Sequence, residues 1–180
     1  MTLRNKNLLK IGALAVLLSS LLLSSVVALA DDAEAPSEKG YLLKEEPKEA
    51  KAVIKVRKDA KNGDEVVVVG RIGGRANPWV KGAAAFSIVD EAVKSCDQIP
   101  GDNCPTPWDY CCEVGLPQKT MFVTFVDEAG KVVRKDARQL LKVKELQTVV
   151  VKGKVKRDKA DNVSIQATNL YVRPSKRAVK

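Results

Sequence analysis

The chain has 180 residues, of which 45% are hydrophobic and 29% charged, the length and balance of one globular domain. It contains no histidine, which excludes Ser-His-Asp and Cys-His catalytic sites and histidine-ligated catalytic metals. The formal net charge of +9 is unevenly placed, because residues 31–130 carry −5 whereas residues 131–180 carry +11.

The first 30 residues have the layout of a secretory signal peptide. Arg4, Lys6 and Lys10 precede a long apolar run, and Ala28 and Ala30 fit a small-x-small cleavage pattern. We expect cleavage after Ala30 and export to the periplasm, the cell envelope or the medium, with no membrane span afterwards. The alternative is a retained anchor, because the apolar run approaches the roughly 20 residues that cross a bilayer.

The segment after this signal is expected to begin as a flexible linker over residues 31–46, which are rich in Glu, Lys, Ala, Pro and Ser. A helix is predicted over residues 47–62, where apolar residues recur at helical spacing. Pro47 suits its first turn, and Gly63 suits its end.

Five strands are predicted after this helix, from runs of β-branched and aromatic residues bounded by turn residues. They cover residues 65–72, 83–89, 119–126, 147–156 and 162–172. The third strand leads through DEAGK into a short return at Val132 and Val133, and a helical turn is expected over residues 136–141.

The last two strands alternate clearly between apolar and polar residues, as expected for strands with one buried face. In the fourth strand the inward set is Val149, Val151, Gly153 and Val155, and the outward set is Lys152, Lys154 and Lys156. In the fifth strand the expected inward set is Val163, Ile165, Ala167 and Tyr171.

Gly70 and Gly153 lie inside strands, which suits strands that bend sharply around a small barrel. The pattern predicts a mainly β fold, a five-stranded OB-fold-like barrel over residues 63–173, preceded by the helix and followed by a basic tail at residues 174–180. The runs GDEVVVVGRIGG and TVVVKGKV resemble the first and fourth strands of OB-fold-like proteins of the nucleic-acid-binding type. Together with the run CPTPWDYCC, the chain resembles uncharacterised exported bacterial proteins built on this fold.

All four cysteines, Cys96, Cys104, Cys111 and Cys112, lie in an insertion between the second and third strands. Cysteines outside the cytoplasm indicate disulfides first. Adjacent cysteines are a strained pair, because their Cα atoms are only about 3.8 Å apart. Two pairings remain open: Cys96 to Cys111 with Cys104 to Cys112, or Cys96 to Cys112 with Cys104 to Cys111.

A metal site is the alternative interpretation of this insertion. Thiolates suit zinc, copper(I) or an iron–sulfur cluster, and the acidic residues, which give residues 95–118 a charge of −4, would attract a cation. The spacing is not the paired C-x-x-C arrangement of common zinc sites. Redox catalysis is disfavoured, because carboxylates near a thiol oppose formation of the thiolate.

Three aromatic residues are candidates for ligand binding. Trp108 and Tyr110 flank Asp109 in the insertion and could stack on a base or a sugar, or else cap the barrel. Trp79 lies in the loop between the first two strands, a region where OB folds commonly bind ligands.

The sequence therefore predicts an exported binding or structural module that is not an enzyme and carries no cofactor. No glycine motif for phosphate or dinucleotide binding is present. Two alternatives stay open: a metal-binding protein that uses the four cysteines, and a protein that binds a polyanion or nucleic acid through Lys152, Lys154, Lys156 and the basic C-terminal half. The partner is expected to be an envelope polyanion or another protein.

Overall fold

The computed structural model describes residues 40–175. The expected signal peptide, most of the expected linker and residues 176–180 of the expected basic tail lie outside the described residues. Within residues 40–175, no helix is long and apolar enough to cross a membrane.

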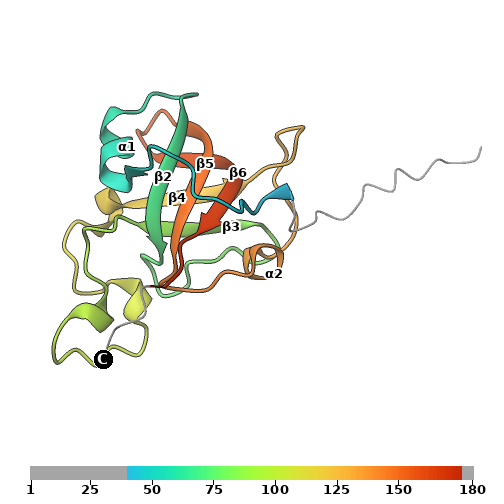
Figure 1. The fold of residues 1–180 in the computed structure, drawn as a ribbon. Helices are drawn as coiled ribbons and strands as arrows, with labels where there is room; N and C mark the ends of the chain where they lie inside the picture. Colours follow the sequence, from blue (N-terminus) through green and yellow to red (C-terminus); the bar gives the residue numbers. More distant parts are fainter. Residues whose placement is uncertain (1–39, 176–180) are drawn as a thin grey trace, which may run out of the picture. The chain divides into compact units, whose positions relative to one another are not determined.

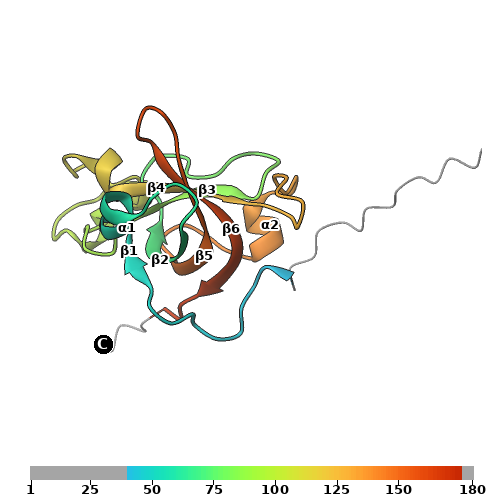
Figure 2. The same cartoon turned by 90° about the horizontal axis from the view of Figure 1, so that it is seen from above.

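Five strands close into a barrel (Figures 1 and 2). Their order around it is β2-β3-β4-β6-β5, and pairing of β5 with β2 completes the ring. β4 and β6 run parallel, whereas the other pairs within the ring are antiparallel. The strands are β2 (Glu65–Ile72), β3 (Ala85–Val89), β4 (Thr120–Phe125), β5 (Thr148–Arg157) and β6 (Val163–Val172). The predicted OB-fold-like barrel, with the cysteine segment between its second and third strands, is confirmed.

The alternation predicted for β5 is confirmed, because its valines are buried and its three lysines are exposed. In β6 the alternation is broken by a bulge: Lys152 pairs with Asn169, but Gly153 pairs with Ala167. The extra residue turns Leu170 into the core and leaves Tyr171 half-buried, so the prediction that Tyr171 faces inward is wrong.

Two short helices lie on opposite sides of the barrel (Figures 1 and 2). α2 (Ala137–Leu141) begins at Asp136, whose carboxylate accepts the amide of Arg138. α1 (Val53–Asp59) buries Val53 and Val56.

The N-terminal helix is therefore shorter than the predicted range of residues 47–62. Before it, the two residues of β1 (Lys51–Ala52) pair in parallel with β2, which takes their backbone out of the helix. The carboxylate of Asp90, at the end of β3, accepts the amide of Ile54 at 2.8 Å and so satisfies a free donor of the first turn. Ala60, with an extended backbone, ends the helix.

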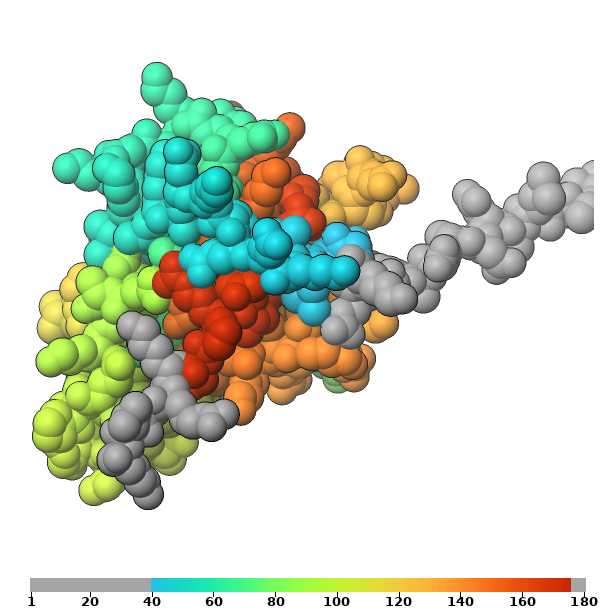
Figure 3. Space-filling view, in the orientation of Figure 1, coloured from blue at the N-terminus to red at the C-terminus, as the bar shows by residue number. Residues whose placement is uncertain are grey.

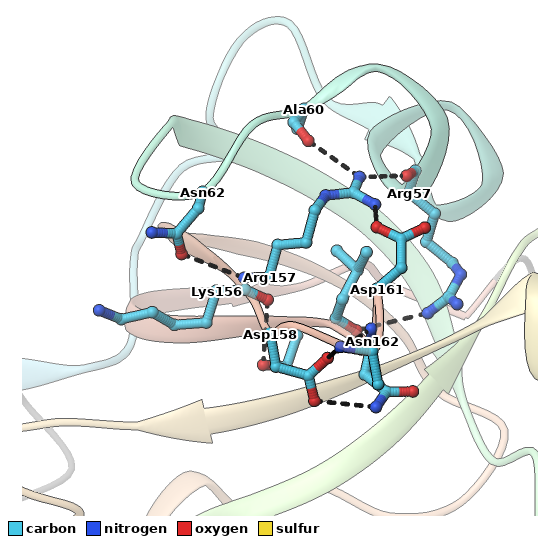
Figure 4. Close-up of polar contacts among 11 residues, drawn as sticks. Arg57, Ala60, Asn62, Lys156, Arg157, Asp158, Asp161 and Asn162 are labelled. Atoms are coloured by element: carbon cyan, nitrogen blue, oxygen red, sulfur yellow. Dashed lines mark hydrogen bonds and ion pairs between the residues drawn. The ribbon is translucent and has the colours of Figure 1, made fainter.

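A polar cluster joins α1 to the turn between β5 and β6 (Figure 4). The guanidinium of Arg157 donates to the carbonyls of Arg57 and Ala60, at 2.6 and 2.9 Å, and also pairs with Asp161. These carbonyls are at the C-terminal end of the helix, where backbone acceptors lack helical partners. In the same turn Asp158 accepts hydrogen bonds from the side chain and the amide of Asn162.

The segment expected as linker is partly ordered against the barrel. The amide of Leu43 donates to the carbonyl of Leu170 at 2.8 Å, and the amide of Leu170 donates to the carbonyl of Tyr41 at 2.7 Å. Further along, Glu46 pairs with Arg173 at 2.7 Å. Part of the segment expected to be a flexible linker therefore contacts β6 and the residue that follows it.

Candidate metal centre

The cysteine segment leaves the barrel after β3 and returns at β4. It carries three 3-10 turns, Cys96–Gln98, Pro107–Asp109 and Leu116–Lys119. Figures 1 and 3 show it in yellow-green, as a lobe that protrudes from the barrel.

Two glycines at the end of β2 allow the lobe to dock closely on the barrel. The amide of Gly74 donates to the carbonyl of Trp108 at 2.8 Å. A Cβ atom on Gly73 would lie 2.4 Å from that same oxygen, so only glycine fits. Next to this contact Tyr110 is buried, with a φ of 59°, in a small second core with two valines of the barrel end. The base of the lobe is thereby fixed to the barrel.

A polar contact from the barrel holds the turn that carries the first cysteine. Nη1 of Arg71, in β2, donates to Oγ of Ser95 at 3.0 Å and to Oε1 of Gln98 at 2.8 Å. Ser95 and Gln98 flank Cys96, whose side chain is only 1% exposed. The position of the Cys96 thiol is therefore set by the barrel.

The other three thiols of the lobe converge on Cys111. Its Sγ atom lies 3.7 Å from that of Cys96, 3.8 Å from that of Cys104 and 3.9 Å from that of Cys112. Cys104 is half-buried, whereas Cys111 and Cys112 are exposed. The insertion thus gathers all four sulfur atoms at one place, which their irregular spacing along the chain does not reveal.

Two aspartates complete the cluster through the same local turn. Oδ1 of Asp102 accepts the amide of Cys104, and Oδ1 of Asp109 accepts the amide of Cys111, both at 2.9 Å. Each is an Asx turn, in which the side chain binds the backbone two residues on. Asp109 also accepts the Thr106 hydroxyl at 2.9 Å. The repeated D-x-C pattern was the sequence signal for these carboxylates.

The donor atoms form two groups, and within each group all atoms lie within 4.8 Å of one another. The first contains Cys96, Cys104, Asp109 and Cys111. The second contains Cys96, Asp102 and Cys112. The expected sites at the four cysteines are thus brought together, and the two aspartates join them as potential ligands.

The pKa values of the exposed thiols are raised. Hydrogen bonds with Cys96, Cys104 and Cys112 raise the pKa of Cys111 well above its ordinary value. For Cys112 the contact with Cys111 acts to lower the pKa, but desolvation and the charge of Asp102 outweigh it. The raised pKa values favour the neutral thiols of Cys111 and Cys112, and neutral thiols are poor nucleophiles.

No disulfide is formed among the described residues, and all four cysteines are free thiols. The shortest sulfur contacts, Cys96 to Cys111 and Cys104 to Cys111, belong to different members of the two predicted pairings. The geometry therefore favours neither pairing over the other.

Trp79 lies in the core instead of offering a surface to a ligand. Its side chain is 7% exposed and packs against Phe86, with the ring centroids 5.6 Å apart. Its indole N–H donates to Glu145 at 2.5 Å, and the Arg138 guanidinium lies over the ring. Phe86 and Arg138 therefore cover the surface of the ring on which a base or a sugar would have to stack.

The other candidate aromatics and the lysines fall outside the cluster of donors. Trp108 is half-buried and donates to the carbonyl of Ala76, so it helps to dock the lobe. The outer face of β5 exposes Lys152, Lys154 and Lys156. Nζ of Lys154 lies 3.9 Å from Oε1 of Glu65.

Comparison with protein-family models finds no match for this chain, and no curated protein matches it. Among solved structures, an aspartyl-tRNA synthetase from Entamoeba histolytica is similar, with a TM-score of 0.43 and 9% sequence identity. The similarity covers 74% of this chain and 25% of that chain. It therefore spans a quarter of the synthetase.

Proposed function

We propose that this protein is an exported, non-catalytic module that binds a zinc ion through Cys96, Cys104, Asp109 and Cys111. The observation that carries the proposal is the spacing of the donor atoms. Two sulfur atoms lie 3.7 and 3.8 Å from Sγ of Cys111. Zinc–sulfur bonds of about 2.3 Å at tetrahedral angles place sulfur atoms about 3.8 Å apart, so these thiols already have the separation that zinc requires.

The composition of the site favours zinc over copper. Zinc accepts thiolate and carboxylate ligands together in a four-coordinate tetrahedral site. Copper(I) prefers soft sulfur ligands alone, and the Asp109 carboxylate is a hard donor. Three thiolates and one carboxylate around a divalent ion also fit a lobe that carries acidic residues but no lysine or arginine over residues 95–118.

Zinc would also order the part of the lobe that the barrel does not hold. The base is fixed through Trp108 and Tyr110, but residues 101–105 are exposed or half-buried, and none of them belongs to a hydrophobic core cluster. A metal that ties Cys104 to Cys96 would close this stretch onto the base, since metal binding contributes its free energy to folding. The function that fits is metal binding that stabilises the lobe as a surface of the module.

The test is a zinc titration of the reduced protein in competition with a chromogenic chelator. We expect tight binding that Cys104→Ser and Asp109→Asn each weaken at least tenfold, because each removes one ligand. Asp97→Asn is the matched control: it makes the same charge change in the same segment, and Asp97 is in neither donor group.

Two results would overturn the proposal. One is an equal loss of affinity in Asp97→Asn and Asp109→Asn, which would mean that only the negative charge of the lobe attracts the ion. The other comes from protein purified from its native compartment: two disulfides by intact mass before and after reduction, with no zinc by elemental analysis, would make the lobe a disulfide-stabilised segment.

A further inference from the structure

We infer that the lobe holds a second, exchangeable zinc site, formed by Cys96, Asp102 and Cys112, in which Cys96 bridges the two ions. This inference rests on the proposed function, because Cys96 belongs to both sites. It adds a second ion, a different set of ligands and an open coordination position.

The second donor group is as compact as the first. The Sγ atom of Cys112 lies 3.6 Å from Oδ2 of Asp102, and both donors lie within 4.8 Å of the Cys96 sulfur. The other oxygen of Asp102 is held by the amide of Cys104, which leaves Oδ2 directed to the Cys112 thiol. A thiol and a carboxylate from separate turns are therefore already paired.

The neighbours Cys111 and Cys112 serve different ions in this arrangement. Their sulfur atoms are 3.9 Å apart, yet each belongs to a different donor group, and Cys96 is the residue that the two groups share. A thiolate sulfur has more than one lone pair, so it can bind two zinc ions at once. The buried position of Cys96, which Arg71 supports through Ser95, suits a bridging ligand that must stay in place.

The second ion would have three protein ligands and one open position. Structural zinc sites are closed by four protein ligands, whereas a site with three keeps a place for water or another ligand. A cavity of about 340 Å³ adjoins this group and is lined by Cys96 and Cys112 together with Lys94, Tyr110 and Glu113. Cys112 is exposed to solvent. The second ion should therefore exchange faster and bind more weakly than the first.

The experiment is a titration of the reduced protein with Zn²⁺ alone, followed by removal with chelators of increasing strength. We expect two equivalents, of which a weak chelator removes one. Asp102→Asn and Cys112→Ser should each reduce the number bound to one and leave the tight ion unchanged. Cys104→Ser should instead lose the tight ion, and Cys96→Ser should disturb both.

The outcomes separate this inference from the proposed function. A single equivalent in the unmodified protein, with the same affinity in Asp102→Asn and Cys112→Ser, overturns the second site and leaves the first intact. No bound zinc overturns both. Far-ultraviolet circular dichroism of each variant shows whether the barrel is folded, and Asp97→Asn, which changes no ligand, should keep both equivalents.

Discussion

At Gly153 the backbones of β5 and β6 approach each other closely. A Cβ atom there would lie 2.2 Å from the carbonyl oxygen of Gln166 and 2.8 Å from the Cα atom of Ala167. Both neighbours are backbone atoms, so no side chain can rotate away. The sequence indicated a bent strand at this glycine, and the structure adds that the bend is a bulge.

We expect Gly153→Ala to lower the free energy of unfolding by about 3 kcal/mol, at the upper end of the range for overpacking, because strand backbone must shift. Chemical denaturation of the reduced protein measures this. Gly40→Ala is the control, since nothing lies within 4 Å of its added Cβ atom and stability should be nearly unchanged. Equal stability of the two variants would mean that the bulge adapts to a side chain.

Asp90 shows which residues sequence reasoning misses. Its side chain is 2% exposed and accepts the amides of Ile54 and Ala92. The first of these lies 36 residues earlier in the chain, so no local pattern marks Asp90 as the group that begins α1. Asp102 and Asp109 differ, because each stands two residues before a cysteine and could have been recognised.

At the scale of elements, β4, β6 and the second half of β5 were predictable because each buries one face, which leaves an alternating pattern in the sequence. β3 is buried along its whole length, and its run of apolar residues predicted it instead. The barrel was predicted from five strand segments and from the glycines inside two of them. The α1 boundaries did not follow, since the preceding residues, Lys51 and Ala52, pair with β2 instead of extending the helix. The ordered residues 41–43 were also missed, because their contacts to Leu170 use backbone groups that every residue carries.

Arg157 gives the clearest prediction about an element. Its guanidinium binds the carbonyls of Arg57 and Ala60 and so connects β5 to the end of α1. We expect Arg157→Ala to destabilise the protein by about 2 kcal/mol, because hydrogen bonds with a charged donor are lost and partly buried carbonyls lose a partner. The backbone amide hydrogens of α1 should also exchange faster with solvent in this variant.

Lys156→Ala is the matched control for Arg157→Ala, because the neighbouring lysine is exposed on the outer face of β5. Its stability should stay within about 0.5 kcal/mol of the unmodified protein. If both variants have the same stability and the same exchange in α1, the contacts in Figure 4 do not hold the helix.

At the scale of the whole molecule, Arg173 near the end of the described chain forms ionic contacts with its beginning and with the turn after β3. Arg173 pairs with Glu46 at 2.7 Å and with Glu91 at 2.9 Å. The hydrogen bond from Arg173 lowers the pKa of Glu46, and hydrogen bonds from Asn162 lower the pKa of Asp158. Both carboxylates are exposed, so each contribution is small.

These lowered pKa values fix the direction of the pH dependence. Because their pKa values are lowered, these carboxylates become protonated at a lower pH in the folded state than in the unfolded state. The stabilisation that they contribute above about pH 4 is therefore lost as the pH falls. We expect the free energy of unfolding to decrease between about pH 5 and pH 3, and Arg173→Gln to make this decrease shallower. Identical slopes in the variant and the unmodified protein, from denaturation at several pH values, would contradict this.

The convergence of three sulfur atoms on Cys111 affects how the purified protein oxidises. Once a two-electron oxidant has oxidised the Cys111 thiol, the thiols of Cys96 and Cys104 lie 3.7 and 3.8 Å away, and these distances select neither as the disulfide partner. Air oxidation of the metal-free lobe should therefore yield a mixture of disulfide isomers. A bound metal ion would occupy the sulfur lone pairs that react with the oxidant. A chemically uniform sample of the protein would therefore depend on keeping that ion bound.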